Sequence, residues 1–153
     1  AQQIVASVVP TSVSMSQPVR IIMEFLASVQ RHCQDTAWSG APEGTKSFAL
    51  TCIDPDAPMG AFIHWLVYNI PASASELPQG GPLPAGTQEV ANDFGKKPYG
   101  GPCPPSGTHR YFFTIYALKV RNLGAVSKKE FLKKVKENQL ASAEIVGRYK
   151  RRR

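Results

Sequence analysis

Acidic, imidazole and phenol side chains stand at the ends of apolar segments of this chain. Asp54 and Asp56 lie in the stretch DPDAP, and His64 opens the apolar segment that follows. His109 and Tyr111 open a later apolar segment, directly after a stretch rich in glycine and proline. A histidine near neutral pH can donate a hydrogen bond to an anionic oxygen or accept one from a hydroxyl. Together these residue types predict a small polar pocket at a sheet edge that binds an anion.

The glycine- and proline-rich stretch at 99–111, YGGPCPPSGTHRY, predicts an ordered loop beside that pocket. Gly100 and Gly101 can present backbone N–H groups to an anion, and they can equally serve only to allow the turn before Pro102. Cys103, in the same loop, is either a reactive thiol or, as is more common, a buried and inert one.

Charged residues next to the pocket have structural interpretations too. Asp54, at the end of a predicted strand, either orients a histidine or accepts from a ligand ammonium at the pocket wall, or it bonds to nearby backbone amides. For Asp56 we favour the second role, which is common in turns. Alternation along a strand directs Arg110 to the face opposite His109 and Tyr111. We therefore predict that Arg110 forms a structural ion pair with a loop carboxylate such as Asp56.

Two catalytic alternatives use the same residues. His64, His109 and Asp54 have the chemistry of zinc ligands, but the chain has no HExxH or HxH spacing. Ser106 closely precedes His109, but no GxSxG motif surrounds a serine. We therefore predict a protein without enzymatic activity, bound metal or cofactor.

The elements that position these residues are predicted mainly as strands. Alternating and β-branched segments indicate strands at 4–9, 46–53, 63–70, 88–91 and 110–121. A period of two places His64 on one face with Leu66, Tyr68 and Ile70. The same rule groups His109 with Tyr111, Phe113, Ile115 and Ala117.

Helices are predicted near both ends of the chain. Ser16 caps the first helix. Its apolar face consists of Ile22, Phe25, Leu26 and Val29. Ser127 and Glu130 form a capping box that opens the second helix, and Asn138 ends it. The buried stripe of this second helix consists of Phe131, Leu132 and Val135. A shorter helix is expected over 141–149, so the fold class is mainly β with terminal helices.

Composition bounds the class of protein. The chain has 153 residues, of which 42% are hydrophobic and 19% charged, as expected for a single domain spanning 1–153. No apolar run is long enough to span a bilayer. The net charge of +7 includes a basic tail at 150–153. We interpret the tail as a solvated end rather than a nucleic-acid contact, because no nucleic-acid-binding motif accompanies it.

The three cysteines indicate a reducing compartment, and we expect a cytoplasmic protein. Cys52 alternates within an apolar strand and is predicted to be a small core residue. The absence of a CxxC pair argues against a zinc knuckle. The sequence is compatible both with a disulfide between Cys33 and Cys103 and with two free thiols.

Motifs in order along the chain resemble the phosphatidylethanolamine-binding protein family, which includes Raf kinase inhibitor protein and the plant flowering-control proteins. The motifs are DPDAP at 54–58, HW at 64–65, NIP at 69–71 and the stretch at 99–111 that ends in GTHRY. The likeness is closest to the bacterial and archaeal branch and covers roughly 38–149. Residues 1–36 match poorly, and RHCQDTA at 31–37 stands where that branch carries Asn-x-Ser-Pro-x-Leu.

The resemblance implies a fold and a site. The fold would be a β-sandwich of two antiparallel sheets with a small anion pocket at one edge. By motif position, that pocket would be formed by Asp54, His64, His109 and Tyr111. The turn at Gly101 and Pro102 would make its lip, Phe62 would shield it, and Tyr149 is a further candidate from the C-terminal closing element.

Two functions are compatible with these observations. The first is non-enzymatic binding of a small phosphorylated or carboxylate anion, such as phosphate or a phospholipid head group, with regulation of a signalling partner. The second is inhibition of a protein kinase or serine protease through surface loops, since the family that the chain resembles includes inhibitors of both. A homodimer is compatible with either function, and we expect no specific nucleic-acid partner.

Overall fold

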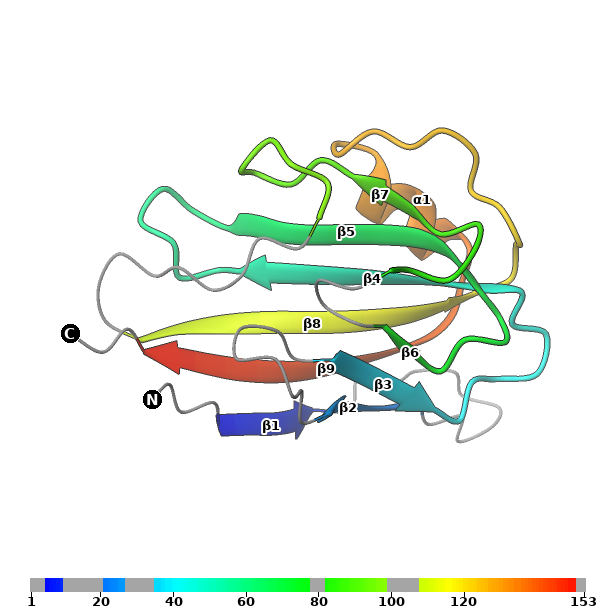
Figure 1. The fold of residues 1–153 in the computed structure, drawn as a ribbon, viewed down its shortest axis with the longest axis horizontal. Coiled ribbons are helices and arrows are strands. Elements are labelled where there is room, and N and C mark those ends of the chain that lie inside the picture. Colours follow the sequence, from blue (N-terminus) through cyan, green and yellow to red (C-terminus); the bar gives the residue numbers. More distant parts are fainter. Residues whose placement is uncertain (1–4, 10–20, 27–34, 78–81, 99–107, 151–153) are drawn as a thin grey trace.

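The computed structural model describes residues 5–9, 21–26, 35–77, 82–98 and 108–150 (Figure 1). Within these ranges the chain forms strands and a short helix. In chain order the elements are β1 (Val5–Val9), β2 (Ile22–Leu26), β3 (Asp35–Ser39), β4 (Ser47–Asp54), β5 (Phe62–Pro71), β6 (Glu76–Leu77), β7 (Gln88–Val90), β8 (Thr108–Leu118), α1 (Phe131–Glu137) and β9 (Gln139–Lys150).

The strands form two antiparallel sheets, which confirms the predicted sandwich-like fold class. The larger sheet has the order β1-β9-β8-β4-β5-β7, and the smaller has the order β2-β3-β6. The long strands β4, β5, β8 and β9 run side by side in Figure 1, with β8 and β4 at the centre of the larger sheet. The five strands predicted from alternation all occur, with ends that differ by at most three residues.

The main core fills the space between the two sheets. The larger sheet presents every second residue of its strands to this core, because side chains alternate along a strand. From β4 and β8 these residues are Phe48, Leu50, Cys52, Tyr111, Phe113, Ile115 and Ala117. The smaller sheet contributes Met23, Trp38 and Leu77. The face predicted for Tyr111 through Ala117 and the core position of Cys52 are thus confirmed.

Helix α1 covers the opposite face of the larger sheet. Phe131 and Val135 of the helix are fully buried, and the ring of Phe131 lies 6.1 Å from that of Tyr68 on β5. The Glu130 N–H donates to Ser127 Oγ over 3.3 Å, as a capping box predicts, but the helix begins only at Phe131 after a turn at 128–130. Its end at Asn138 is confirmed, and so is the burial of Phe131 and Val135, whereas Leu132 is only partly buried.

The helix predicted after Ser16 is wrong where the chain is described, because residues 22–26 form strand β2. Ile21 and Met23 are 4% and 0% exposed, whereas Ile22 between them is 56% exposed. This alternation has the period of a strand, not of a helix. The apolar spacing was compatible with both, and pairing with β3 decides between them.

The helix predicted over 141–149 is also wrong, because this segment belongs to β9. Strand β9 lies between β1 and β8, so both of its edges are hydrogen-bonded. Ala141, Ala143 and Ile145 face the main core. Alanine and glutamate favour helices locally, but the pairing of a central strand outweighs that preference.

Candidate functional site

Asp54 is the last residue of β4, and it is buried where the strand turns into the proline-rich loop. Its Oδ2 atom lies 2.7 Å from Nδ1 of His109, which is also buried. Its Oδ1 atom accepts the Asp56 N–H over 2.8 Å. Asp54 therefore fills two of the roles that the sequence left open, because one oxygen orients an imidazole and the other holds a turn.

Tyr111 and His64 complete a histidine cluster, which we define as Asp54, His64, His109 and Tyr111. Tyr111 follows His109 on the same face of β8, as predicted, and both are buried. The ring centroids of His64 and Tyr111 lie 5.1 Å apart in an edge-to-face arrangement. Strand β4 lies between β5 and β8, so residues from three neighbouring strands meet at one end of the larger sheet.

The face predicted for His64 is wrong, and a β-bulge is the reason. Cys52 pairs with Trp65, but the next residue, Ile53, pairs with Ile63, so His64 is an extra residue in β5. An extra residue breaks the alternation of faces along a strand. Leu66 and Tyr68 consequently belong to the core beneath α1, whereas His64 contacts Tyr111 of the main core.

An aromatic wall, formed by Phe62 and Phe94, stands beside His64. The ring centroid of Phe62 lies 5.0 Å from His64 and 4.7 Å from Phe94. Phe94 in turn lies 5.4 Å from His64, and 46% of Phe94 is exposed. Phe62 thus lies beside His64, and its shielding role stays a prediction. The sequence analysis did not identify Phe94 as a site residue, because only the fold of the loop at 91–98 brings it beside His64.

Asn92 fixes that loop and was also missed. Its side chain is buried, and its Nδ2 donates to the carbonyls of His64, over 3.0 Å, and Pro98, over 2.9 Å. Its Oδ1 accepts the N–H groups of Phe94 and Lys96. A buried asparagine with four such bonds is a positioning residue. The sequence offered one sign of this role, because Asn92 directly follows the short strand predicted at 88–91.

Asp93 ties the same loop to β5 and to the turn before α1. The Ile63 N–H donates to its Oδ2 over 2.7 Å, and Lys128 Nζ lies 2.6 Å from its Oδ1. Burial acts to raise the pKa of Asp93, but the hydrogen bonds from Lys128 and the Ile63 N–H outweigh it and lower the pKa. Asp93 is therefore an anion at neutral pH that holds the loop.

Arg110 and Asp56 form the ion pair that the sequence predicted. Arg110 donates to Asp56 through Nε over 2.9 Å and through Nη2 over 2.8 Å, and its backbone N–H donates over 3.0 Å. Hydrogen bonding from the guanidinium lowers the pKa of Asp56 to about 2. The local turn role favoured for Asp56 is thus wrong, because these partners lie 54 positions away.

Several predicted residues cannot be placed. Gly101 and Pro102 lie outside the described residues, as do Cys33, Cys103 and Ser106. The backbone of Tyr149 pairs with His109 in β9, next to the cluster, and its side chain is not described. In the part of the chain that is described, no three His, Cys, Asp or Glu side chains are grouped to hold a metal. No helix there is long and apolar enough to cross a membrane.

Comparisons with known proteins show the family to which the chain belongs. A family model described as phosphatidylethanolamine-binding protein matches residues 27–150. A UPF0098 protein of Aquifex aeolicus is 49% identical over 122 residues, which cover 74% of this chain and 71% of that protein. A UPF0098 protein of Methanothermobacter thermautotrophicus is 44% identical over 121 residues, 75% of this chain and 80% of the relative.

A solved structure shares the fold. The crystal structure of Escherichia coli YbcL, described as a new member of the mammalian PEBP family, matches with a TM-score of 0.72 and 40% sequence identity. The match covers 78% of this chain and 80% of that chain. The chain therefore belongs to the phosphatidylethanolamine-binding protein family.

Proposed function

We propose that the histidine cluster binds a small anion with a phosphoryl or carboxylate group and does not transform it. The observation that supports this most directly is the 2.7 Å contact between Asp54 Oδ2 and His109 Nδ1, both buried. A carboxylate that accepts from Nδ1 holds the imidazole in one orientation. In the imidazolium form of the ring, the remaining nitrogen, Nε2, donates a charge-assisted hydrogen bond to an anionic oxygen.

His64 and Tyr111 supply the other donors of the proposed site. Their rings are already in contact at 5.1 Å, and Asn92 holds the backbone of His64 through the carbonyl oxygen. Donors held in place by packing and hydrogen bonds lose little conformational entropy when a ligand arrives. The proposal therefore assigns contact with the anion to His64, His109 and Tyr111, and orientation to Asp54 and Asn92.

The aromatic wall favours an anion that carries an organic substituent. Phe62 and Phe94 place apolar surface beside the imidazole of His64, and Phe94 is partly exposed to solvent. A phosphate ester with an organic substituent can bury apolar surface there, and inorganic phosphate cannot. We therefore expect O-phosphoethanolamine, which represents a phospholipid head group, to bind more tightly than inorganic phosphate.

Equilibrium dialysis with radiolabelled O-phosphoethanolamine tests the proposal. Wild type should bind one equivalent, and the double variant His64→Ala with His109→Ala should lose at least about 100-fold in affinity, about tenfold for each charge-assisted hydrogen bond. Lys129→Gln with Lys133→Gln removes two positive charges on exposed residues elsewhere and serves as the control. Equal binding by the double histidine variant and wild type would refute the proposal.

The same incubation separates binding from catalysis. The proposal predicts that O-phosphoethanolamine is recovered intact, whereas a hydrolase would release inorganic phosphate. Inhibition of a protein kinase or serine protease, and a homodimer, stay predictions from the sequence. An inhibition panel at high protein concentration and a sedimentation measurement test them separately.

A further inference from the structure

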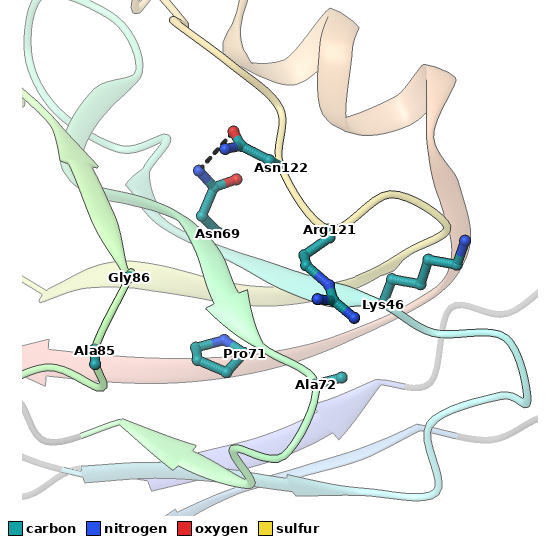
Figure 2. A pocket seen from close by; sticks show the side chains of 8 residues that line it. All are labelled: Lys46, Asn69, Pro71, Ala72, Ala85, Gly86, Arg121 and Asn122. Carbon is teal, nitrogen blue, oxygen red and sulfur yellow. Dashed lines mark hydrogen bonds between the residues drawn. The ribbon is translucent and has the colours of Figure 1, made fainter.

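A pocket with both polar and apolar lining lies at the opposite end of the larger sheet from the histidine cluster. It has a volume of about 420 Å³. Residues before β4, at the end of β5, in the turn at 85–86 and after β8 line it, as Figure 2 shows. The lining residues are Lys46, Asn69, Pro71, Ala72, Ala85, Gly86, Arg121 and Asn122.

This pocket is far from the proposed ligand site. Lys46 immediately precedes β4 and Asp54 ends it, so the eight residues of that strand separate the two sites. At about 3.3 Å per residue, the separation is roughly 26 Å. A compact ligand cannot contact both the pocket and the histidine cluster at once, so whatever occupies this pocket is a separate molecule.

The positively charged residues that line the pocket favour an anionic ligand. Lys46 and Arg121 are both exposed, and in the described ranges neither takes part in an ion pair. The described residues that line the pocket include no acidic side chain. Figure 2 shows the Arg121 guanidinium beside Pro71 and Ala72 and the Lys46 ammonium turned away from it, so an anion at Arg121 requires the exposed Lys46 side chain to swing toward it. Two cations without a carboxylate partner at one pocket produce a positive potential that attracts a negatively charged ligand.

Hydrogen bonds hold the two cationic segments together before any ligand binds. The Lys46 N–H donates to the Leu118 carbonyl over 2.8 Å, and Ser47 Oγ donates to the Val120 carbonyl over 2.6 Å. These bonds fix the chain at Lys46 beside the segment that carries Arg121. The backbone positions that carry both cations are therefore set before a ligand binds, and only the two exposed side chains have to be ordered by it.

Asn69 builds the opposite wall at the cost of an unusual backbone conformation. Its φ of 54° makes it the only non-glycine residue with positive φ in the described ranges. Its Nδ2 donates to Asn122 Oδ1 over 3.0 Å, and its Oδ1 accepts the Leu123 N–H over 2.9 Å. The pairing of β4 with β5 shifts register between Phe48 and Leu50, so Asn69 lies at an irregularity of β5, and these hydrogen bonds hold its backbone there.

We propose that this pocket is a second anion site, in which Lys46 and Arg121 bind a small phosphorylated compound carrying at least two negative charges. The Arg121 guanidinium matches the geometry of a phosphoryl group, and Lys46 adds a point charge. The pocket is larger than a phosphate ion, and Pro71, Ala72 and Ala85 give it an apolar part for an organic substituent.

The test is a titration of isotope-labelled protein with glycerol 3-phosphate at low ionic strength, followed by NMR. The backbone N–H signals of Asn69, Gly86 and Asn122 should shift along one saturating curve. Acetate, which carries one charge, should bind at least about tenfold more weakly, since it loses a charge-assisted contact. Higher salt should weaken binding of the phosphate ester.

Two variants of opposite design test the residues. Lys46→Gln with Arg121→Gln should raise the dissociation constant at least about 30-fold, because both charge-assisted contacts are lost. Ala85→Glu keeps both cations but places a carboxylate in the pocket, and should weaken binding by a similar factor. Lys129→Gln with Lys133→Gln removes two positive charges elsewhere, as many as Lys46→Gln with Arg121→Gln removes, and should change the dissociation constant less than about twofold.

The double variant His64→Ala with His109→Ala separates this inference from the proposed function. Its signals at Asn69, Gly86 and Asn122 should still saturate as in wild type. The inference is wrong if these signals do not saturate in wild type, or if the Lys129 and Lys133 control weakens binding as much as the pocket variants. Loss of the shifts in the double histidine variant would equally overturn it, because the second site would then not be independent.

Discussion

Asp54 Oδ2 and His109 Nδ1 lie 2.7 Å apart, although 55 positions separate the two residues in the chain. The contact joins the turn after β4 to the beginning of β8. Because Asp54 also accepts the Asp56 N–H, a single carboxylate fixes the loop and the imidazole together. The orientation of His109 in the candidate site therefore depends on Asp54.

Removal of the Asp54 carboxylate should destabilise the protein. Asp54→Ala leaves the buried His109 imidazole and the Asp56 N–H without their acceptor, and should lower the free energy of unfolding by about 3 kcal/mol. Asp54→Asn retains an acceptor oxygen and should cost roughly half as much. Urea denaturation at neutral pH measures both values. A loss below about 1 kcal/mol for Asp54→Ala would show that the contact adds little.

Asn92 should matter to stability although it contacts no proposed ligand. Asn92→Ala removes four hydrogen bonds from a buried position and leaves the His64 and Pro98 carbonyls without this donor. We expect a loss of about 2–3 kcal/mol in the free energy of unfolding. The exposed Asn122 is the control, and Asn122→Ala should cost less than about 1 kcal/mol. Equal effects of the two variants would contradict the positioning role of Asn92.

The ion pair of Asp56 and Arg110 should make stability depend on pH in the acid range. Arg110 holds the pKa of Asp56 at about 2, below the ordinary value of 3.8. Between pH 3.8 and about pH 2, the Asp56 carboxyl of the unfolded chain binds a proton more readily than that of the folded chain. The free energy of unfolding therefore falls as the pH decreases through this range. The Tm of wild type should exceed that of Asp56→Asn by a constant amount above about pH 4, and this difference should shrink toward about pH 2. A difference that does not change with pH would exclude this contribution.

A pair of neighbouring substitutions tests the strand that replaced the predicted N-terminal helix. Met23 is 0% exposed and Ile22 is 56% exposed. Met23→Ala should cost about 2–5 kcal/mol because it leaves a cavity in the main core. Ile22→Thr, on the solvent side, should change stability by less than about 0.5 kcal/mol. Denaturant unfolding of both variants measures this contrast, and similar losses would contradict the alternation of β2.

The local sequence pattern predicted the strands whose residues alternate clearly between apolar and polar. It did not predict the structure where both a helical period and a strand period fit the same residues. In β2, the apolar residues at 22, 25 and 26 also satisfy helical spacing, and only pairing with β3 excludes the helix. In β9, alanine and glutamate favour a helix locally, while the partners β1 and β8 come from distant parts of the chain. Such non-local pairing is not visible in a local pattern.

The candidate site was predictable where side-chain chemistry defines it. Asp54, His64, His109 and Tyr111 are polar residues at the ends of apolar strands, and the structure brings them together. The bulge that turns His64 toward Tyr111 was not predictable, because a bulge depends on the register between β4 and β5. The supporting roles of Asn92 and Phe94 depend on loop geometry in the same way.

The central claim is that both histidines contact one anion, and imidazole NMR tests it most directly. Titration with O-phosphoethanolamine should shift the His64 and His109 ring signals together, with one dissociation constant. Saturation of both signals at the same ligand concentration is the predicted result. If neither signal moves, or if only one of them saturates, the two residues do not form a shared anion site and the account is wrong.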